Sequence, residues 1–238
     1  IKHRLKKGVK PKAILIVHLY GMAAKLDEIL RISSIYDIPV IEDAAEALGS
    51  TYTGKALGSF GKFGILSFNG NKIISTSGGG ALLLNSKQER ERALFLATQA
   101  RDIAPHFQHS EIGYNYRMSN ILASLGNAQL KNLEERVKRR RDVFEFYSTS
   151  FASINDQFGR NTIASTKEDA GVHSNRWLSS FLIKPWNNIT NTAWRNTLEA
   201  HGIESRPLWK PMHLQPIFLK YLFFGDQTSD RIFFQGIC

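Results

Sequence analysis

The 238-residue chain is 42% hydrophobic and 22% charged, which is typical of a folded globular protein and excludes a disordered one. No segment approaches the roughly 20 apolar residues that cross a bilayer, and the single cysteine, Cys238, excludes a disulfide framework and a cysteine-rich zinc site. We therefore expect a cytoplasmic protein. The net charge of +10 comes largely from clusters within residues 2–12 and 131–141. We interpret these clusters as solvated surface or a site for small anions in preference to a nucleic-acid surface.

The first part of the chain predicts a strand, a helix and a second strand. Residues 13–20 form a continuous apolar run, typical of a strand covered on both faces, and residues 23–36 place apolar side chains at helical spacing. Residues 40–43 form another short apolar run that ends in acidic residues. This order predicts a parallel sheet, in which ligand sites lie beyond the carboxyl ends of the strands. Asp43 lies at such an end.

The next part of the chain predicts two more strands and a polar loop between them. The strands are expected at 65–68 and 81–84, and the loop over 69–80 is rich in glycine. Ser86, followed three residues later by Glu89, predicts the capped start of a helix that runs to about residue 99.

The remaining elements predict a change of architecture along the chain. Residues 101–116 lack periodicity and predict a long loop, and Ser119 begins a long helix that we expect to end at about Tyr147. After about residue 151, short apolar segments alternate with helical ones. We therefore expect an α/β domain over 1–150 and a smaller α+β domain over 151–238.

Three polar side chains lie at strand ends or in the loops that follow them. Taken singly, Asp43 could cap a helix, Ser67 could be a satisfied strand hydroxyl and Lys72 could be a surface lysine. Together they fit a pyridine cofactor, because a lysine partly removed from water is a candidate nucleophile and a buried carboxylate can pair with a protonated ring nitrogen. The hydroxyl of Ser67 could donate to a phosphate.

Other reaction classes lack their motifs. The chain has no phosphate loop of the G-x-x-x-x-G-K-[ST] type, no G-x-G-x-x-G fingerprint and no G-x-S-x-G elbow. Its seven histidines include no pair with metal-site spacing beyond the weak pair His106 and His109, so we expect no metal site.

Five ordered motifs carry a resemblance to a known family: 17–21 (VHLYG), 41–49 (IEDAAEALG), 67–72 (SFNGNK), Gly79–Gly80 and 113–118 (GYNYRM). The series resembles the DegT/StrS-type family of pyridoxal-phosphate-dependent sugar-nucleotide aminotransferases over residues 10 to 220. The SFNGNK and TSGGG segments, at 67–72 and 76–80, are most similar to those of members that act on UDP-linked 4-keto-6-deoxy amino sugars. The resemblance implies the α/β fold of type I aminotransferases, with a three-layer α/β/α large domain, incomplete at its N-terminus, and a smaller α+β domain.

The resemblance also implies roles for individual residues. Lys72 would form the Schiff base with pyridoxal 5′-phosphate and later move a proton between the cofactor and the sugar. Asp43 would pair with the pyridinium nitrogen, and Ser67 would donate to the phosphate. Glu46 occupies a place near the phenolic oxygen where relatives often carry Gln or His, and this departure leaves its role open. Asn115 would reach across a homodimer interface to the cofactor phosphate of the neighbouring subunit.

The implied reaction passes an amine from an amino acid, expected to be L-glutamate, to the keto carbon of a nucleotide-linked sugar. Arg206 and His213 match the substrate region of the family, with plain packing as the equal alternative. The active sites would be shared in a homodimer, with no nucleic-acid or membrane partner.

The departures from the family pattern imply a truncated member. Complete members carry, before the first predicted strand, a phosphate-binding loop and an aromatic residue that stacks on the pyridine ring. We expect the chain alone to bind the cofactor weakly or not at all and to be inactive. A non-catalytic sensing relative and a sugar dehydratase are the alternatives within the family. Lys72 argues against both, since a non-catalytic relative would have no need of the lysine and dehydratases carry histidine there. A basic nucleic-acid-binding protein is the alternative from outside the family.

Overall fold

The computed structural model describes residues 1–184 and 190–238, which form two compact units. Unit 1 comprises Ile1–Lys138 and Asp169–Trp177, and unit 2 comprises Arg139–Glu168 and Leu178–Cys238. The chain therefore leaves unit 1 inside a long helix and returns to it for nine residues. Among the described residues, no helix is both long and apolar enough to cross a bilayer. The division into domains 1–150 and 151–238 stays a prediction.

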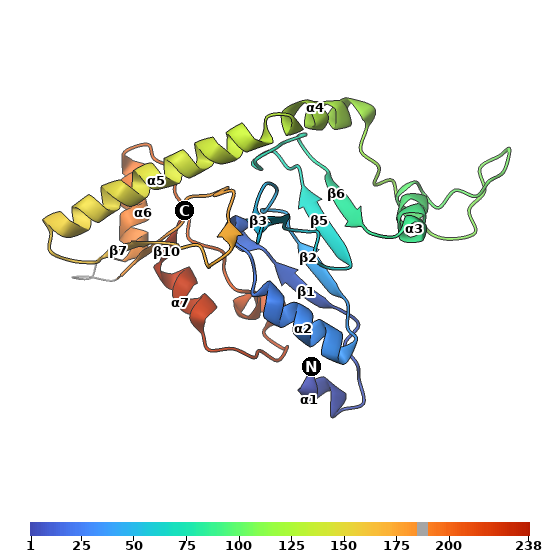
Figure 1. Ribbon diagram of the computed structural model, residues 1–238, viewed down its shortest axis with the longest axis horizontal. Helices are drawn as coiled ribbons and strands as arrows, with labels where there is room; N and C mark the ends of the chain where they lie inside the picture. Colours follow the sequence, from blue (N-terminus) through green and yellow to red (C-terminus); the bar gives the residue numbers. More distant parts are fainter. Residues whose placement is uncertain (185–189) are drawn as a thin grey trace. The chain divides into compact units, whose positions relative to one another are not determined.

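A four-stranded sheet organises unit 1 (Figure 1). Its order is β1 (Ile14–Val17), β2 (Val40–Asp43), β5 (Phe63–Ser67) and β6 (Gly80–Leu84). The first three strands are parallel, and β6 is antiparallel to β5. The predicted β-α-β order is confirmed, because α2 (Leu26–Tyr36) connects β1 to β2. The carboxyl ends of β1, β2 and β5 therefore share one edge of the sheet.

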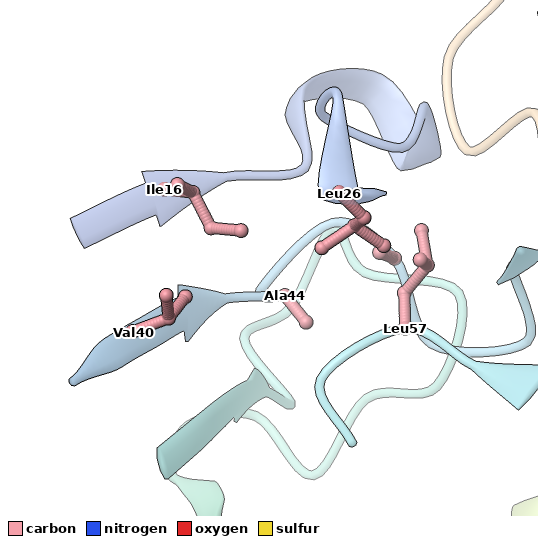
Figure 2. Packing of buried hydrophobic residues seen from close by; sticks show 6 residues of the cluster. Ile16, Leu26, Val40, Ala44 and Leu57 are labelled. Atoms are coloured by element: carbon pink, nitrogen blue, oxygen red, sulfur yellow. The ribbon is translucent and has the colours of Figure 1, made fainter. Parts of the chain in front are cut away.

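The core of unit 1 lies on the face of the sheet that α2 covers. Ile16 of β1, Val40 of β2 and Leu26 of α2 are buried together with Ala44, Ala47 and Leu57, and Figure 2 shows the first three gathered around Ala44 and Leu57. The expectation that the first strand is covered on both faces is wrong within the described residues. Leu15 and Val17 alternate with Ile16 and are 62% and 44% exposed, because the described elements cover only one side of this strand.

The helices that come after β6 in the sequence agree only in part with the local sequence signals. α3 (Lys87–Ala97) begins as predicted, with Ser86 Oγ accepting the N–H of Glu89. The single helix expected to run from Ser119 to about Tyr147 is instead two helices, α4 (Asn120–Leu130) and α5 (Leu133–Gln157). The break falls at Asn132, a residue type that favours the N-cap of a new helix over a helix interior.

The other elements of unit 1 are short. They comprise α1 (Lys2–Leu5), the 3-10 turn η1 (Leu19–Gly21) and a small sheet with the order β4 (Lys55–Ala56), β3 (Thr51–Tyr52) and β8 (Val172–His173). The pairing of β3 with β8 joins the returning segment Asp169–Trp177 to the rest of unit 1.

Unit 2 has a small antiparallel sheet of its own, with the order β10 (Gly236–Ile237), β9 (Phe181–Ile183) and β7 (Ile163–Ser165). Phe144, Ile163 and Phe181 form its buried cluster, against which Phe151 and Trp194 pack. The remaining elements are α6 (Asn191–Ala200), α7 (Thr228–Gln235) and the 3-10 turns η2 (Met212–Leu214) and η3 (Pro216–Phe218).

Candidate active site

Asp43 and Ser67 lie at the ends of neighbouring parallel strands and on the same face of the sheet. Asp43 pairs in register with Ile65 of β5, and Ser67 follows Ile65 by two residues, so side-chain alternation puts all three on one face. Both polar side chains are half-buried. A carboxylate and a hydroxyl are therefore presented together at the carboxyl edge of the sheet.

Local hydrogen bonds orient both groups. Asp43 Oδ1 accepts the N–H of Ala45 at 3.1 Å, which fixes the carboxylate over the turn that follows β2. Ser67 Oγ accepts the N–H of Asn69 at 3.4 Å. Each side chain thus stabilises the first turn after its own strand, as short polar residues commonly do.

Lys72 faces Glu46 and Trp177. Its Nζ lies 3.8 Å from Glu46 Oε1, and both side chains are 13% exposed. The same Nζ lies 4.0 Å from the centroid of the Trp177 ring. Within residues 1–184 and 190–238 no ion pair joins Lys72 to Asp43, so Glu46 is the carboxylate that faces the lysine.

Glu46 is held by the turn that follows β1. The N–H of Tyr20 donates to Glu46 Oε2 at 2.7 Å, and Tyr20 adopts a left-handed conformation with φ of 55°. Gly21 follows with φ of 78°, and a Cβ at this position would overlap Asn175 Oδ1. Only glycine fits such a place without strain. The Tyr20–Gly21 pair in the VHLYG motif thus aims one backbone donor at Glu46.

Asn175 ties the returning segment to the loop that carries Glu46. Its Nδ2 donates to the backbone oxygens of Glu46 and Leu48 at 2.8 and 2.9 Å, and its N–H donates to Ser50 Oγ at 2.8 Å. Asn175 and Ser50 are fully buried. Hydrogen bonds made in a dry environment define geometry strongly, so this asparagine positions the backbone on both sides of Glu46.

The loop that carries Lys72 is fastened at its far side by α4. Gln129 Oε1 accepts the backbone N–H of Ser75 at 3.3 Å, and Gln129 Nε2 donates to the backbone oxygen of Ser75. Gly126 of the same helix packs against Thr76, where an added Cβ would lie 2.8 Å from the Thr76 methyl group. The loop is therefore held between the end of β5 and α4.

A buried acid–histidine pair lies beneath the strand ends. His18 and Glu42 are both fully buried, and Nε2 of His18 lies 2.9 Å from Glu42 Oε2. His18 Nδ1 accepts the N–H of Ala24 at 3.2 Å, so the ring proton is assigned to Nε2, which donates to Glu42.

Glu42 also accepts three backbone N–H groups from the glycine-rich turn, those of Gly58 at 2.8 Å, Phe60 at 2.6 Å and Gly61. Burial by itself raises the pKa of Glu42, but the hydrogen bonds from His18 and these backbone groups outweigh it and hold the pKa below its ordinary value. Glu42 is thus a buried carboxylate that fastens the turn to β2, one residue before Asp43.

The other predicted site residues lie apart from this cluster or in unit 2. Asn115 is exposed in the segment between α3 and α4 and forms an isolated bridge with Thr98. Arg206 is exposed and paired with Glu204 at 2.7 Å. His213 stacks on Phe223 with a centroid distance of 3.7 Å, and its Nε2 lies 2.7 Å from Asp230 Oδ1. The substrate role and the packing alternative of His213 both stay predictions.

Sequence reasoning did not single out Trp177, Asn175, Gln129 or the His18–Glu42 pair as functional. For two of them the sequence carries a signal: His18 and Glu42 stand inside motifs that were recognised, next to positions that were assigned roles. Ser174, Asn175 and Arg176 form a polar run directly before Trp177, and all four are buried. A polar run beside a tryptophan is a fair signal of a buried network, although it does not name the partners.

Comparison with known proteins shows the family to which the chain is related. The DegT/DnrJ/EryC1/StrS aminotransferase family matches residues 2–230. The chain is 47% identical over 237 residues to the putative pyridoxal phosphate-dependent aminotransferase EpsN of Bacillus subtilis (strain 168), covering 98% of the chain and 59% of that protein. It is 35% identical over 209 residues to GDP-perosamine synthase of Escherichia coli O157:H7, covering 88% of the chain and 55% of that protein.

Solved structures show the same fold. A DegT DnrJ EryC1 StrS aminotransferase from Brucella abortus superposes with a TM-score of 0.86 at 25% identity, covering 100% of the chain and 61% of the other. The predicted α/β fold of type I aminotransferases is therefore confirmed. The chain spans about three fifths of the length of these relatives.

Proposed function

Because the chain belongs to the DegT/DnrJ/EryC1/StrS aminotransferase family, we propose that its protein is a sugar aminotransferase that uses pyridoxal 5′-phosphate. The observation that carries the proposal is a half-buried carboxylate and a half-buried hydroxyl on adjacent strand ends, with a largely buried lysine in the loop that follows. These are the kinds of side chain that a phosphorylated pyridine aldehyde requires: an anion for the ring nitrogen, a hydroxyl for the phosphate and an amine for the aldehyde. The Bacillus subtilis relative EpsN is named as a putative pyridoxal phosphate-dependent aminotransferase, which refers to the same cofactor.

The residues present fit the cofactor in kind, and two of them lie on one face of the sheet. The Lys72 side chain is 13% exposed, so water has limited access to its primary amine. Asp43 and Ser67 share one face of the sheet, which allows one planar ligand to meet both. We assign Lys72 to hold the cofactor through its amine, Asp43 to face the ring nitrogen and Ser67 to bind the phosphate.

The bound cofactor supplies an electron sink that makes a proton removable at the carbon bearing the transferred nitrogen. The chain's own residues then have separate tasks. The Asp43 carboxylate would keep the ring nitrogen protonated, because an anion favours the charged form of its neighbour. Lys72 Nζ would act as the base that moves a proton between C4 of the sugar and C4′ of the cofactor.

We further propose that the substrates are a nucleotide-linked 4-keto-6-deoxy sugar and L-glutamate. The name of the GDP-perosamine synthase relative supports an amino-sugar product. The exposed position of Asn115 is compatible with a homodimer in which it serves the neighbouring subunit's site. Arg206 is a candidate for the anionic part of the substrate, because it is a guanidinium with an exposed side chain, and His213 is the second candidate of the substrate region.

Borohydride trapping tests the assignment of Lys72. The protein is incubated with excess pyridoxal 5′-phosphate, reduced with borohydride, digested and mapped by mass spectrometry. We expect the phosphopyridoxyl label on Lys72 in the wild-type protein and a loss of specific labelling in K72A. Lys55, an exposed lysine of the same unit, is the internal control. Labelling spread evenly over surface lysines, or none on Lys72, refutes the proposal.

A further inference from the structure

We propose that Trp177 is a positioning residue that cradles the free amine of Lys72 together with Glu46. The inference rests on the proposed function, because it gives a resting place to the lysine in the state in which its amine is not bonded to a cofactor. The juxtaposition joins three residues from segments far apart in the sequence, at positions 46, 72 and 177.

Two hydrogen bonds hold Trp177, one from its indole and one from its backbone. Trp177 is 2% exposed, and its Nε1 donates to the backbone oxygen of Asn71 at 2.7 Å. The backbone N–H of Trp177 donates to Asn175 Oδ1 at 2.9 Å. Since Asn71 directly precedes Lys72, the indole is hydrogen-bonded to the backbone from which the lysine side chain extends. The ring therefore has one defined orientation toward that side chain.

The face of this ring receives the lysine. Nζ lies 4.0 Å from the ring centroid, well inside the distance of about 6 Å over which a cation is attracted to an aromatic face. The attraction grows when the cation is removed from water, and the Lys72 side chain is 13% exposed. A tryptophan buried only for packing would require no ammonium group on its face, so its position points to a role toward the amine.

The contacts are suited to a group that must leave. Glu46 Oε1 lies 3.8 Å from Nζ, beyond the length of a hydrogen bond, so the carboxylate attracts the ammonium group without fixing it. The attraction of a cation to a ring face also depends less on direction than a hydrogen bond does. Nζ thus lies between the Glu46 carboxylate and the ring face without a hydrogen bond to either, an arrangement that lets it move when it reacts.

Amine reactivity in the cofactor-free protein tests the cradle without any measurement of turnover. The rate of Lys72 acetylation by a limiting pulse of acetic anhydride is compared in the wild-type protein, W177F and W177L by peptide mass mapping. Both variants lose the hydrogen bond to Asn71 and part of the ring volume, but only W177L loses the aromatic face. We expect a Lys72 rate about five-fold higher in W177L and less than about two-fold higher in W177F.

Lys55, which lies over Phe60 at 4.4 Å but is exposed, serves as an internal control and should react at the same rate in all variants. Equal rate increases in W177F and W177L would show a packing role and overturn the proposal, as would no increase in either.

The second arm is E46Q, which keeps an oxygen for the Tyr20 N–H but removes the charge, and we expect a Lys72 rate about two-fold higher. It keeps the proposal falsifiable if W177L does not fold, because an unchanged rate in E46Q contradicts the cradle. Failure of the proposed function is separate, since it would appear as no Lys72 label after treatment with pyridoxal 5′-phosphate and borohydride.

Discussion

Removal of the Glu42 carboxylate should destabilise unit 1 more than any other single loss of charge considered above. E42A would leave the Nε2–H of His18 and the backbone N–H groups of Gly58, Phe60 and Gly61 without their acceptor, in a place where Glu42 itself is fully buried. Each buried donor without an acceptor costs about 1–3 kcal/mol, and breaking a buried pair costs about 3–5 kcal/mol. Because such terms do not add, we expect a loss of about 4 kcal/mol in the free energy of unfolding.

Urea unfolding followed by circular dichroism measures this loss. E28A is the matched control, because Glu28 is an exposed glutamate on α2 of the same unit, and changes at such positions usually stay within about 0.5 kcal/mol. Since domains are stable by only about 5–15 kcal/mol, E42A should show a much lower urea midpoint. A midpoint for E42A that matches that of E28A would refute the reasoning that this carboxylate fastens the glycine-rich turn.

Three further outcomes are expected. The pKa of Glu42 in the folded state lies below its ordinary value, so the stabilisation that the carboxylate provides is complete above the unfolded-state pKa of about 4.3. This stabilisation is lost as the pH falls through the folded-state pKa. Unfolding free energies measured from pH 6 to 3 should therefore fall less steeply in E42Q than in the wild-type protein. G21A should lower the unfolding free energy by about 1–3 kcal/mol, because φ is positive and the new methyl group overlaps Asn175, and a thermal melt unchanged from wild type would contradict this. Q129A removes both hydrogen bonds to Ser75, so amide hydrogen exchange at residues 73–77 should be faster than in wild type while exchange in β1 stays unchanged.

The sequence predicted the parts of the fold that depend on local signals. The apolar runs predicted β1 and β2, the helical spacing predicted α2, and the Ser86–Glu89 spacing predicted the start of α3. The position of Asp43 followed from topology, because parallel strands end at the same edge of a sheet. These predictions needed no knowledge of contacts between distant segments.

The surroundings of Lys72 could not be predicted in this way. The hydrogen bond from Trp177 to Asn71 joins residues 106 positions apart, and that from Asn175 to Glu46 joins residues 129 positions apart. No periodicity or cap in either segment records these partners. The break between α4 and α5 was missed for a different reason. The apolar side chains keep their helical spacing past Asn132, although the backbone helix is interrupted there.

Two different supports place the groups of the candidate site. Asp43 and Ser67 are placed by the pairing of β2 with β5, so their spacing depends on strand register and changes only if the sheet changes. The Lys72 amine is placed by Glu46 and Trp177, which depend on Asn175 and on the return of Asp169–Trp177 to unit 1. A substitution at Asn175 should therefore disturb the lysine while the strand ends keep their geometry. A site whose carboxylate is rigid and whose amine rests on separate contacts suits chemistry in which only the lysine has to move.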